Sequence, residues 1–414
     1  MKADVLVIGG GSIGVSCAYY LAQGGAKVVL LEKDALGSGC IYGTACLITP
    51  SHAVPLAAPG VIRQGLKWMF REDSPLLIRP RLDLALFRWM LQFASYCREE
   101  PMRRGLPVLR DLCRASLKLF EQLTEREHLE FGFEKRGALY VASTPGGFEK
   151  LKHESALLKE FQFDPLLLDG PGVHAKEPFV RPEVAGAVYY AEDAHGDSHR
   201  FVTALGAVLQ RLGVSVHTGV EVRDFLWNSS RLRGVRTSQG EFEADSVVLA
   251  AGSWSTRLAR SLRLRVPVQP GKGYSVTIEN PADGPRIPVV HQERRVIITP
   301  LGQRLRFAGT MEFAGMDLSL NPVRSDAALR GGAGVLREIP NPRILERWCG
   351  LRPCTPDGLP ILGRVRQVEN LYLATGHAML GFTLGPISGQ LIAELVAGKA
   401  PSLPLEPLSL DRFS

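Results

Sequence analysis

The chain has 414 residues, of which 45% are hydrophobic and 22% charged. This composition excludes a disordered or fibrous chain, and the length allows two domains with sizeable cores. Lysine and arginine exceed aspartate and glutamate by 49 minus 42, which gives a net charge of +7. The basic residues are scattered without a long block of like charge, so a mildly basic surface is favoured over a nucleic-acid footprint.

The cysteine pattern and the N-terminus indicate the compartment. The seven cysteines are spread along the chain and contain no Cys-x-x-Cys pair of the kind that binds zinc or cycles between thiol and disulfide. No basic and apolar leader precedes the first strand-like run, and no apolar run reaches the roughly 18 residues that span a bilayer. We expect a cytoplasmic protein without a transmembrane helix, and nothing calls for a metal.

The strongest motif occupies residues 4–32. An apolar run at its start predicts a buried strand, which leads directly into Gly9, Gly11 and Gly14 and then a helical segment. A second apolar run ends in Glu32, where an acid meets a ribose hydroxyl in dinucleotide-binding units. Glycine lets the backbone approach a pyrophosphate, and a helix N-terminus offers free N–H groups and a positive dipole end. The stretch therefore predicts a Rossmann-type dinucleotide-binding unit.

The segment after Glu32 is rich in glycine, serine and threonine as far as His52. In a dinucleotide domain, such a loop can bring backbone amides to the phosphates and the middle of the cofactor, and a plain surface loop is the alternative. Residues 246–255, SVVLAAGSWS, repeat the opening pattern, because a buried strand stops at a turn of small residues. We expect this strand to lie parallel to the first one, with its end against the dinucleotide.

Residues 61–100 are helical segments that interleave aromatic side chains with arginine and lysine, from Arg63 to Arg98. One interpretation is a basic amphipathic surface that rests on a membrane. A helical lid or ordinary core packing is favoured, because apolar stripes at helical spacing are usually buried within the protein.

The remaining segments predict a second unit. Asp197 or Ser198 is placed to cap the helix that follows it. Strand-like runs at 272–279, 287–291, 294–300 and 304–312 predict an antiparallel sheet. The proline- and glycine-punctuated residues 348–365 predict a loop, and residues 377–398 predict a glycine-rich turn that runs into a closing helix.

The N-terminal unit, VVLAAG, and GLRPCTPDGLPILG followed by LYLATGHAMLGFTLGPISGQLIAEL together resemble the D-amino acid oxidase superfamily of FAD-dependent oxidoreductases. Within it, SHAVPLAAPGVIRQGLKWMF, SPLLIRPRLDLALFRWM, PGKGYSVTI and GHAMLGFT are most similar to the dye- or quinone-linked bacterial D-amino acid dehydrogenases. The resemblance implies an α/β fold, with a Rossmann-type FAD-binding domain interleaved with an α+β substrate domain whose sheet is mostly antiparallel. We expect the FAD-binding domain at 1–65, 196–262 and 350–414, and the substrate-binding domain at 66–195 and 263–349.

The resemblance also implies site residues. Arg352 matches the arginine that pairs with a substrate carboxylate, Tyr274 either adds a hydroxyl to this clamp or belongs to the core, and His377 either contacts the flavin or caps the last helix. The implied FAD contacts lie at strand ends and in turns: Gly9, Gly11, Ser12, Ile13, Gly14, Glu32, Lys33, Gly43, Thr44, Ala45, Leu47, Val222, Ala251, Gly252, Trp254, Gly363, Gly381, Phe382 and Thr383.

The reaction that the resemblance implies is oxidation of D-amino acids by hydride transfer from Cα to flavin N5, followed by hydrolysis to 2-oxo acids and ammonia. A quinone or an artificial dye would take the electrons. Apolar substrates are expected, because Val296 stands where glycine-oxidising relatives carry a tyrosine. The alternatives are a D-hydroxyproline dehydrogenase, a glycine or sarcosine oxidase and, less favoured, a tRNA-modifying flavoprotein. Peripheral association with the inner face of a membrane, through the Arg63–Arg98 stretch, is left open.

Overall fold

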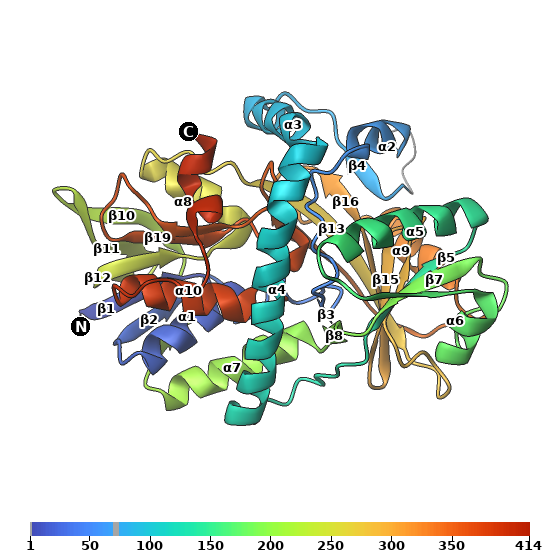
Figure 1. The fold of residues 1–414 in the computed structure, drawn as a ribbon. Helices are drawn as coiled ribbons and strands as arrows, with labels where there is room; N and C mark the ends of the chain where they lie inside the picture. The colour runs from blue at the N-terminus through green and yellow to red at the C-terminus, as the bar shows by residue number, and fades with distance from the viewer. Residues whose placement is uncertain (1, 69–73) are drawn as a thin grey trace.

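The structure is a computed structural model that describes residues 2–68 and 74–414. Figure 1 shows two sheets, one with the N-terminal strand β1 (Ala3–Ile8) and one with β13 (Gln269–Glu279). The long helix α4 (Glu99–Glu127) runs across the front between them. The short pair β3 (Leu47–Ile48) and β8 (Ala194–His195) also lies between the two sheets.

The first sheet is built around parallel strands. Strand β1 pairs in parallel with β2 (Val28–Leu31) on one side and with β12 (Gly240–Leu249) on the other. Its side chains are buried on both faces, as expected for a parallel sheet covered by helices. The other strands are β9 (Ser215–His217), β10 (Val222–Asn228), β11 (Arg231–Thr237), β18 (Ile361–Arg364) and β19 (Leu371–Thr375).

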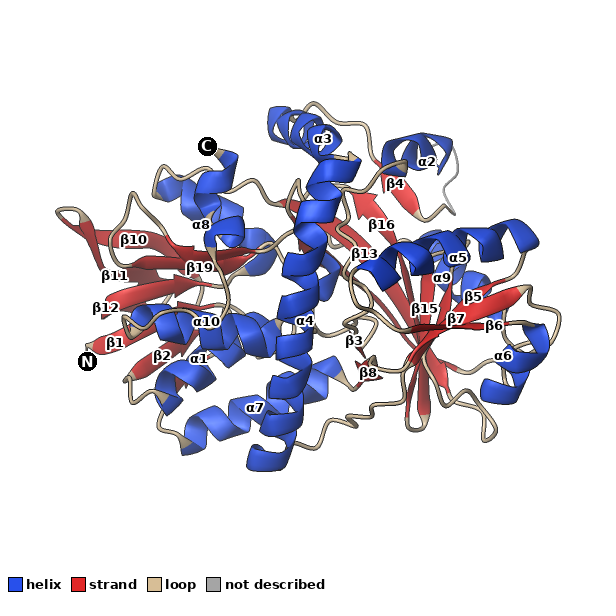
Figure 2. Ribbon diagram, viewed as in Figure 1, coloured by secondary structure: helices blue, strands red, loops and turns tan. Residues whose placement is uncertain are grey.

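Helices cover this sheet and position its ends. In Figure 2, helices α1, α7 and α10 lie on one side of the strands. The helices of this half are α1 (Ser12–Gln23), α7 (Ser198–Arg211), α8 (Ser255–Ser261) and α10 (Gly385–Val396), with the short turns η1 (Gly252–Trp254) and η2 (Ala378–Leu380). The predicted cap of α7 is confirmed, because the Asp197 carboxylate accepts hydrogen bonds from two N–H groups of the first turn.

The second sheet is mostly antiparallel, as predicted, and has the order β17-β13-β16-β15-β14-β5-β7-β6. Within the described residues, the pairs β14–β5 and β16–β4 are the parallel ones in this sheet. Helices α9 (Pro322–Ala333), α5 (Pro145–Glu160) and α6 (Gly170–Lys176) accompany it. The strands are β4 (Leu76–Ile78), β5 (Ala138–Ala142), β6 (Pro165–Leu168), β7 (Gly186–Tyr190), β14 (Val289–His291), β15 (Val296–Leu301), β16 (Arg304–Phe313) and β17 (Ile344–Cys354).

The predicted loop at 348–365 is wrong. Strand β17 covers most of its first half and β18 lies near its end. The proline at 353 is tolerated because β17 is the edge strand of its sheet, where a missing N–H breaks no ladder on the open side. The predicted domain boundary at residue 350 falls inside β17, and the domain division otherwise stays a prediction.

The stretch from Arg63 to Arg98 forms α2 (Val61–Trp68), β4 and α3 (Leu84–Tyr96), and residues 69–73 of it lie outside the described part. The inner face of α3 is core, since Trp89 is 4% exposed and stacks on Phe93. Its outer face leaves Leu84, Phe87 and Leu91 exposed. Within the described residues, every helix is too short or too polar to cross a bilayer.

Candidate active site

Positions 9, 11 and 14, which follow β1, are glycine for different structural reasons. Gly9 has a φ of +112°, and a Cβ there would lie 2.6 Å from the carbonyl oxygen of Ala250. A Cβ on Gly14 would lie 1.8 Å from the carbonyl oxygen of Gly9, so this glycine allows α1 to pack on the strand. A Cβ on Gly11, in contrast, would meet no atom within 4 Å. The N-terminus of α1 therefore faces open space, which suits the binding of a phosphate.

The end of β2 supplies an acid and a cation to the same space. One carboxylate oxygen of Glu32 accepts a hydrogen bond from the N–H of Gly10 at 2.7 Å, which fixes the acid beside the glycine turn. The ammonium of Lys33 lies 4.9 Å from the ring centre of Trp254. As expected from the sequence, β12 runs parallel to β1, so Trp254 and Gly252, which follow β12, meet the end of β2.

A cavity of about 1560 Å³ connects these residues with the second sheet. Ordinary small-molecule pockets have volumes of about 300–1,000 Å³, so this cavity has room for more than one ligand. Of the predicted cofactor contacts, it is lined by Gly9, Gly11, Ser12, Ile13, Glu32, Lys33, Gly43, Thr44, Ala45, Leu47, Val222, Ala251, Gly252, Trp254, Gly381 and Phe382.

Three predicted cofactor contacts do not line the cavity. Gly14 packs α1 on the strand. Gly363 lies in β18 with a φ of +138°. The hydroxyl of Thr383 donates to the carbonyl oxygen of Leu47 at 3.2 Å and so ties the last helical segment to β3. Gly14 and Thr383 therefore support the elements that border the cavity without lining it themselves.

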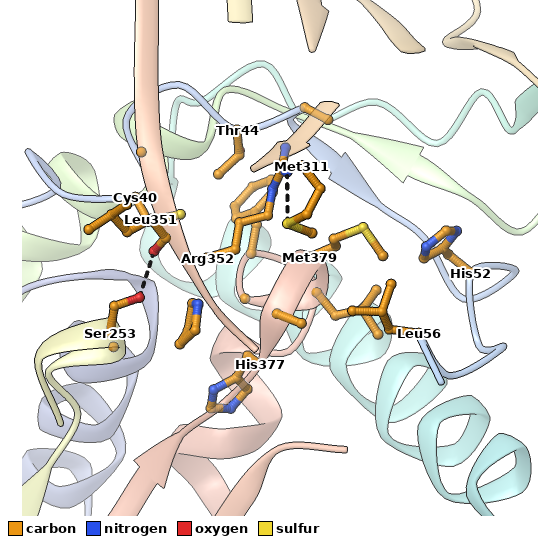
Figure 3. Close-up of a pocket in the computed structure, with 18 of the residues that line it drawn as sticks. Cys40, Thr44, His52, Leu56, Ser253, Met311, Leu351, Arg352, His377 and Met379 are labelled. Atoms are coloured by element: carbon orange, nitrogen blue, oxygen red, sulfur yellow. Dashed lines mark hydrogen bonds between the residues drawn. The ribbon is translucent and has the colours of Figure 1, made fainter. Parts of the chain in front are cut away.

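Arg352 extends from β17 into the cavity (Figure 3). Its guanidinium lies over Gly273, where a Cβ would come within 2.2 Å of it. Its Nη1 donates to the carbonyl oxygen of Thr310 at 2.6 Å. Among residues 2–68 and 74–414, no carboxylate pairs with this cation. Burial lowers the pKa of Arg352 from its usual value, but a guanidinium stays protonated in proteins.

A β-bulge aims the acceptor at Arg352. Between the pairs Lys272–Glu312 and Tyr274–Gly309, strand β16 has one residue more than β13. Thr310 lies in this bulge with a φ of +59°, a left-handed conformation that costs a threonine energy. Bulges often redirect groups beside active sites, and here one turns a carbonyl oxygen toward the cavity arginine.

Tyr274 lies on the other face of the same sheet. Side chains alternate along a strand, and Arg352 shares its face with Gly271 and Gly273, so Tyr274 points away from it. The tyrosine hydroxyl donates to the buried carboxylate of Glu312 at 2.7 Å, and the residue does not line the cavity. Of the two predicted roles, the structure favours that of a core residue.

The ring of His377 is held by the last helix. Its Nε2 lies 2.9 Å from the hydroxyl oxygen of Ser388, and burial lowers the pKa of the imidazole to about 3. The side chain makes no capping hydrogen bond to the turn that follows it. His377 therefore borders the cavity as a neutral residue whose ring is anchored to α10.

Sequence reasoning missed several side chains around Arg352. Figure 3 shows Cys40, His52, Leu56, Met311 and Met379 around the same space. They come from four segments of the chain, and although His52, Leu56 and Met379 lie in stretches that carry the family resemblance, none of the five was expected at the site. Only strand alternation with Gly309 could have indicated Met311, and the bulge at residue 310 breaks that alternation.

The sequence matches the family described as FAD dependent oxidoreductase (DAO) over residues 4–395. A relative named D-amino acid dehydrogenase, from Paramagnetospirillum magneticum, is 35% identical over 99% of both chains. Another with this name, from Methylobacterium nodulans, is also 35% identical over 99% of both chains.

Solved structures agree with this match. Glycine oxidase from Geobacillus kaustophilus has a TM-score of 0.81 at 25% identity, and covers 99% of this chain and 98% of its own. Glycine oxidase from Bacillus cereus has a TM-score of 0.77 at 26% identity over 96% of both chains. The predicted resemblance and fold class are confirmed, and the chain belongs to the DAO family of FAD-dependent oxidoreductases.

Proposed function

We propose that the protein is a D-amino acid dehydrogenase, which oxidises apolar D-amino acids to imino acids that water converts to 2-oxo acids and ammonia. The observation that carries this proposal is Arg352, a partly buried cation without a carboxylate partner in the described part of the chain, on the wall of the cavity that the dinucleotide motif also lines. An unpaired buried charge is costly unless a ligand pairs with it. The names of the relatives support an amino acid as that ligand.

The residues at the dinucleotide end fit FAD. The open space at Gly11, in front of the first turn of α1, accommodates a pyrophosphate. Glu32 is fixed where a ribose hydroxyl would lie, and Val222 and Trp254 would border the adenine. Gly43 packs against the ring of Trp348 with no room for a side chain, which leaves its backbone free to border the middle of the cofactor. When bound, FAD supplies the acceptor for the hydride that leaves the substrate Cα.

Arg352 would position the substrate. Its Nη1 is already oriented by Thr310, and the remaining N–H groups of the fork can bind both oxygens of a carboxylate. Leu56, Met311 and Met379 surround this position with apolar atoms, which exclude water and favour the neutral amine that the oxidation requires. Positioning then supplies most of the acceleration that this chain's own residues contribute.

We also propose that electrons leave to a quinone, or to a dye in assays, and that the protein lies in the cytoplasm against the inner face of the membrane. Leu84, Phe87 and Leu91 form one exposed apolar stripe along α3, with Arg88 beside it. The opposite face of this helix lines the cavity through Phe93. A lipid-soluble acceptor at this surface would lie close to the cavity.

Liposome flotation tests the membrane part. Vesicles with anionic lipid should bind the wild type, and Phe87→Ser with Leu91→Ser should lose most of this binding. The matched control is Leu166→Ser with Leu167→Ser, which changes two exposed leucines on β6. Equal binding of both double variants would contradict the proposal.

Anaerobic mixing tests the reaction itself. Apolar D-amino acids, but not their L-forms, should bleach the flavin absorbance of the purified holoprotein, and slow recolouring in air would mark a dehydrogenase. Bleaching only by glycine, sarcosine or hydroxyproline would contradict the proposed substrate and indicate one of the related oxidases or dehydrogenases.

A further inference from the structure

The turn Thr49–His52 after β3 is held by a buried acid. Asp193 accepts hydrogen bonds from the Ser51 N–H at 3.0 Å, the Ser51 hydroxyl at 2.5 Å and the Thr49 hydroxyl at 3.0 Å. The hydroxyl of Tyr140 lies 3.1 Å from the Ser51 hydroxyl oxygen. Asp193 itself is completely buried, so its carboxylate acts only on this turn and its neighbours.

Burial of the Asp193 carboxylate lowers the stability of the fold, which indicates that the conformation of residues 49–52 is important for function. In the part of the chain that the structure describes, no cation pairs with Asp193, and burial raises the pKa of this carboxyl to about 7. A buried carboxylate held by hydroxyls and one N–H is less stable than an apolar residue in a well-packed core. The hydrogen bonds to Asp193 hold the turn in one conformation.

The turn presents His52 to the cavity. Figure 3 shows its ring among the lining side chains. Within residues 2–68 and 74–414, no hydrogen bond holds the ring of His52. Burial, with a smaller contribution from the charge of Arg295, lowers the pKa of His52 to about 4. The ring is therefore neutral at physiological pH and offers one N–H donor and one acceptor nitrogen.

Apolar side chains separate His52 from the arginine. In Figure 3, Leu56 and Met379 are drawn between Arg352 and the imidazole, and both line the same cavity. A substrate whose carboxylate binds Arg352 can extend its side chain along these apolar atoms. The end of that side chain would then meet the ring of His52.

We propose that His52 recognises the end of the substrate side chain and that Asp193 is the positioning residue that holds His52 there. The inference rests on the proposed function and deepens it: among D-amino acids with a largely apolar side chain, those that end in a hydroxyl or amide are preferred over wholly apolar ones of the same shape. An imidazole that faces a wholly apolar side chain loses its hydrogen bonds to water and gains none, so kcat/KM is lower for the wholly apolar member of such a pair.

Matched substrate pairs test the contact. D-tyrosine and D-phenylalanine, and D-glutamine and D-methionine, are similar in shape and differ in the polar group at the end of the side chain. His52→Ala should lower the ratio of kcat/KM for the polar over the apolar member by about fivefold or more in at least one pair. His52→Gln, which keeps a donor and an acceptor, should retain much of the ratio. Ratios that stay within about twofold in all pairs would overturn the proposal.

Variants of the acid test the positioning role. Asp193→Ala should lower the same ratio, whereas Asp193→Asn, which can still accept from the Ser51 N–H, should restore it. Glu192→Gln is the control, because this neighbouring acid pairs with Arg114 and not with the turn. An Asp193→Ala holoprotein with the wild-type ratio would overturn the role of Asp193.

A binding measurement separates this inference from the proposed reaction. 3-(4-Hydroxyphenyl)propionate and 3-phenylpropionate carry the carboxylate but no amine, and their binding can be followed by the flavin absorbance. The hydroxylated acid should bind more tightly to the wild type, and His52→Ala should remove the difference. If no D-amino acid bleaches the flavin, the proposed function fails, whereas an unchanged preference in His52→Ala removes only the recognition by His52.

Discussion

The two faces of the second sheet carry charged side chains that are partnered in opposite ways. On one face, Arg352 lines the cavity without a carboxylate partner in the described residues. On the other, the fully buried Glu312 contacts Arg324 at 3.2 Å and Arg79 at 2.5 Å and accepts from the Tyr274 hydroxyl at 2.7 Å. Paired charge holds the fold together, whereas the unpaired cation is available to a ligand. A charged side chain in the interior therefore does not by itself indicate a ligand site. The better indicator is a charged side chain on a cavity wall that has no partner of opposite charge.

The largest effect is expected from removal of the unpaired charge. Arg352→Ala should lower kcat/KM by about 10²–10³-fold, since truncating one partner of a buried charged contact costs about 2–5 kcal/mol. The free energy of unfolding should stay about equal or rise, because a partly buried cation without a carboxylate partner is lost. Steady-state kinetics and urea unfolding measure the two quantities. A variant with wild-type KM and kcat would remove Arg352 from the site.

Removal of the charge of Glu312, the paired acid, should have the opposite effects, with lower stability and nearly unchanged kcat/KM. Glu312→Gln leaves Arg324 and Arg79 beside a neutral group, so the free energy of unfolding should fall by about 3 kcal/mol. The folded holoprotein should keep its kcat/KM within a few fold. Glu279→Gln is the matched control, because its ion pair with Arg343 is exposed and contributes less than about 1 kcal/mol. Equal unfolding midpoints for the two variants would contradict the comparison.

Asp193 lies between these extremes, because hydrogen bonds satisfy it without a cation. The pKa of this carboxyl is raised to about 7 in the folded protein from its ordinary value of 3.8. The folded state thus binds the proton more tightly than the unfolded chain, and wild-type stability falls as the pH rises from about 4 to about 7. Asp193→Asn has no such titration, so its stability relative to the wild type should rise by roughly 2–3 kcal/mol between pH 5 and pH 8. Thermal unfolding at both pH values measures this, and a pH-independent difference would contradict the assignment.

The smallest effect is expected for Tyr274→Phe. It removes one hydrogen bond to Glu312 and should cost about 1 kcal/mol of stability while kcat/KM stays within about twofold. The same kinetic and unfolding measurements suffice. A tenfold loss of kcat/KM at unchanged stability would place the hydroxyl in the substrate clamp after all.

The dinucleotide end could be predicted from the sequence because its geometry is local. Gly9 and Glu32 lie at the ends of two adjacent strands, so the order of residues alone brings them together. The substrate end depends on the register between strands far apart in the chain, which decides that Tyr274 faces away from Arg352. His52 lies in a stretch that carries the family resemblance, but no local pattern indicates its role, and only tertiary packing places it in the cavity.

Strand β17 belongs to the substrate sheet but is fastened to the nucleotide half. Trp348 packs on Gly43, the hydroxyl of Ser253 donates to the carbonyl oxygen of Leu351 at 3.0 Å, and residue 354 forms a bridge with residue 377. Strands β15 and β16 reach the same half, because the hydroxyl of Thr299 donates to the carbonyl oxygen of Ala45 at 2.6 Å and Arg304 pairs with Asp197. The strand that carries Arg352 is thus held to the nucleotide half along the cavity, so the distance between this arginine and the dinucleotide end is fixed by packing and does not depend on a mobile loop.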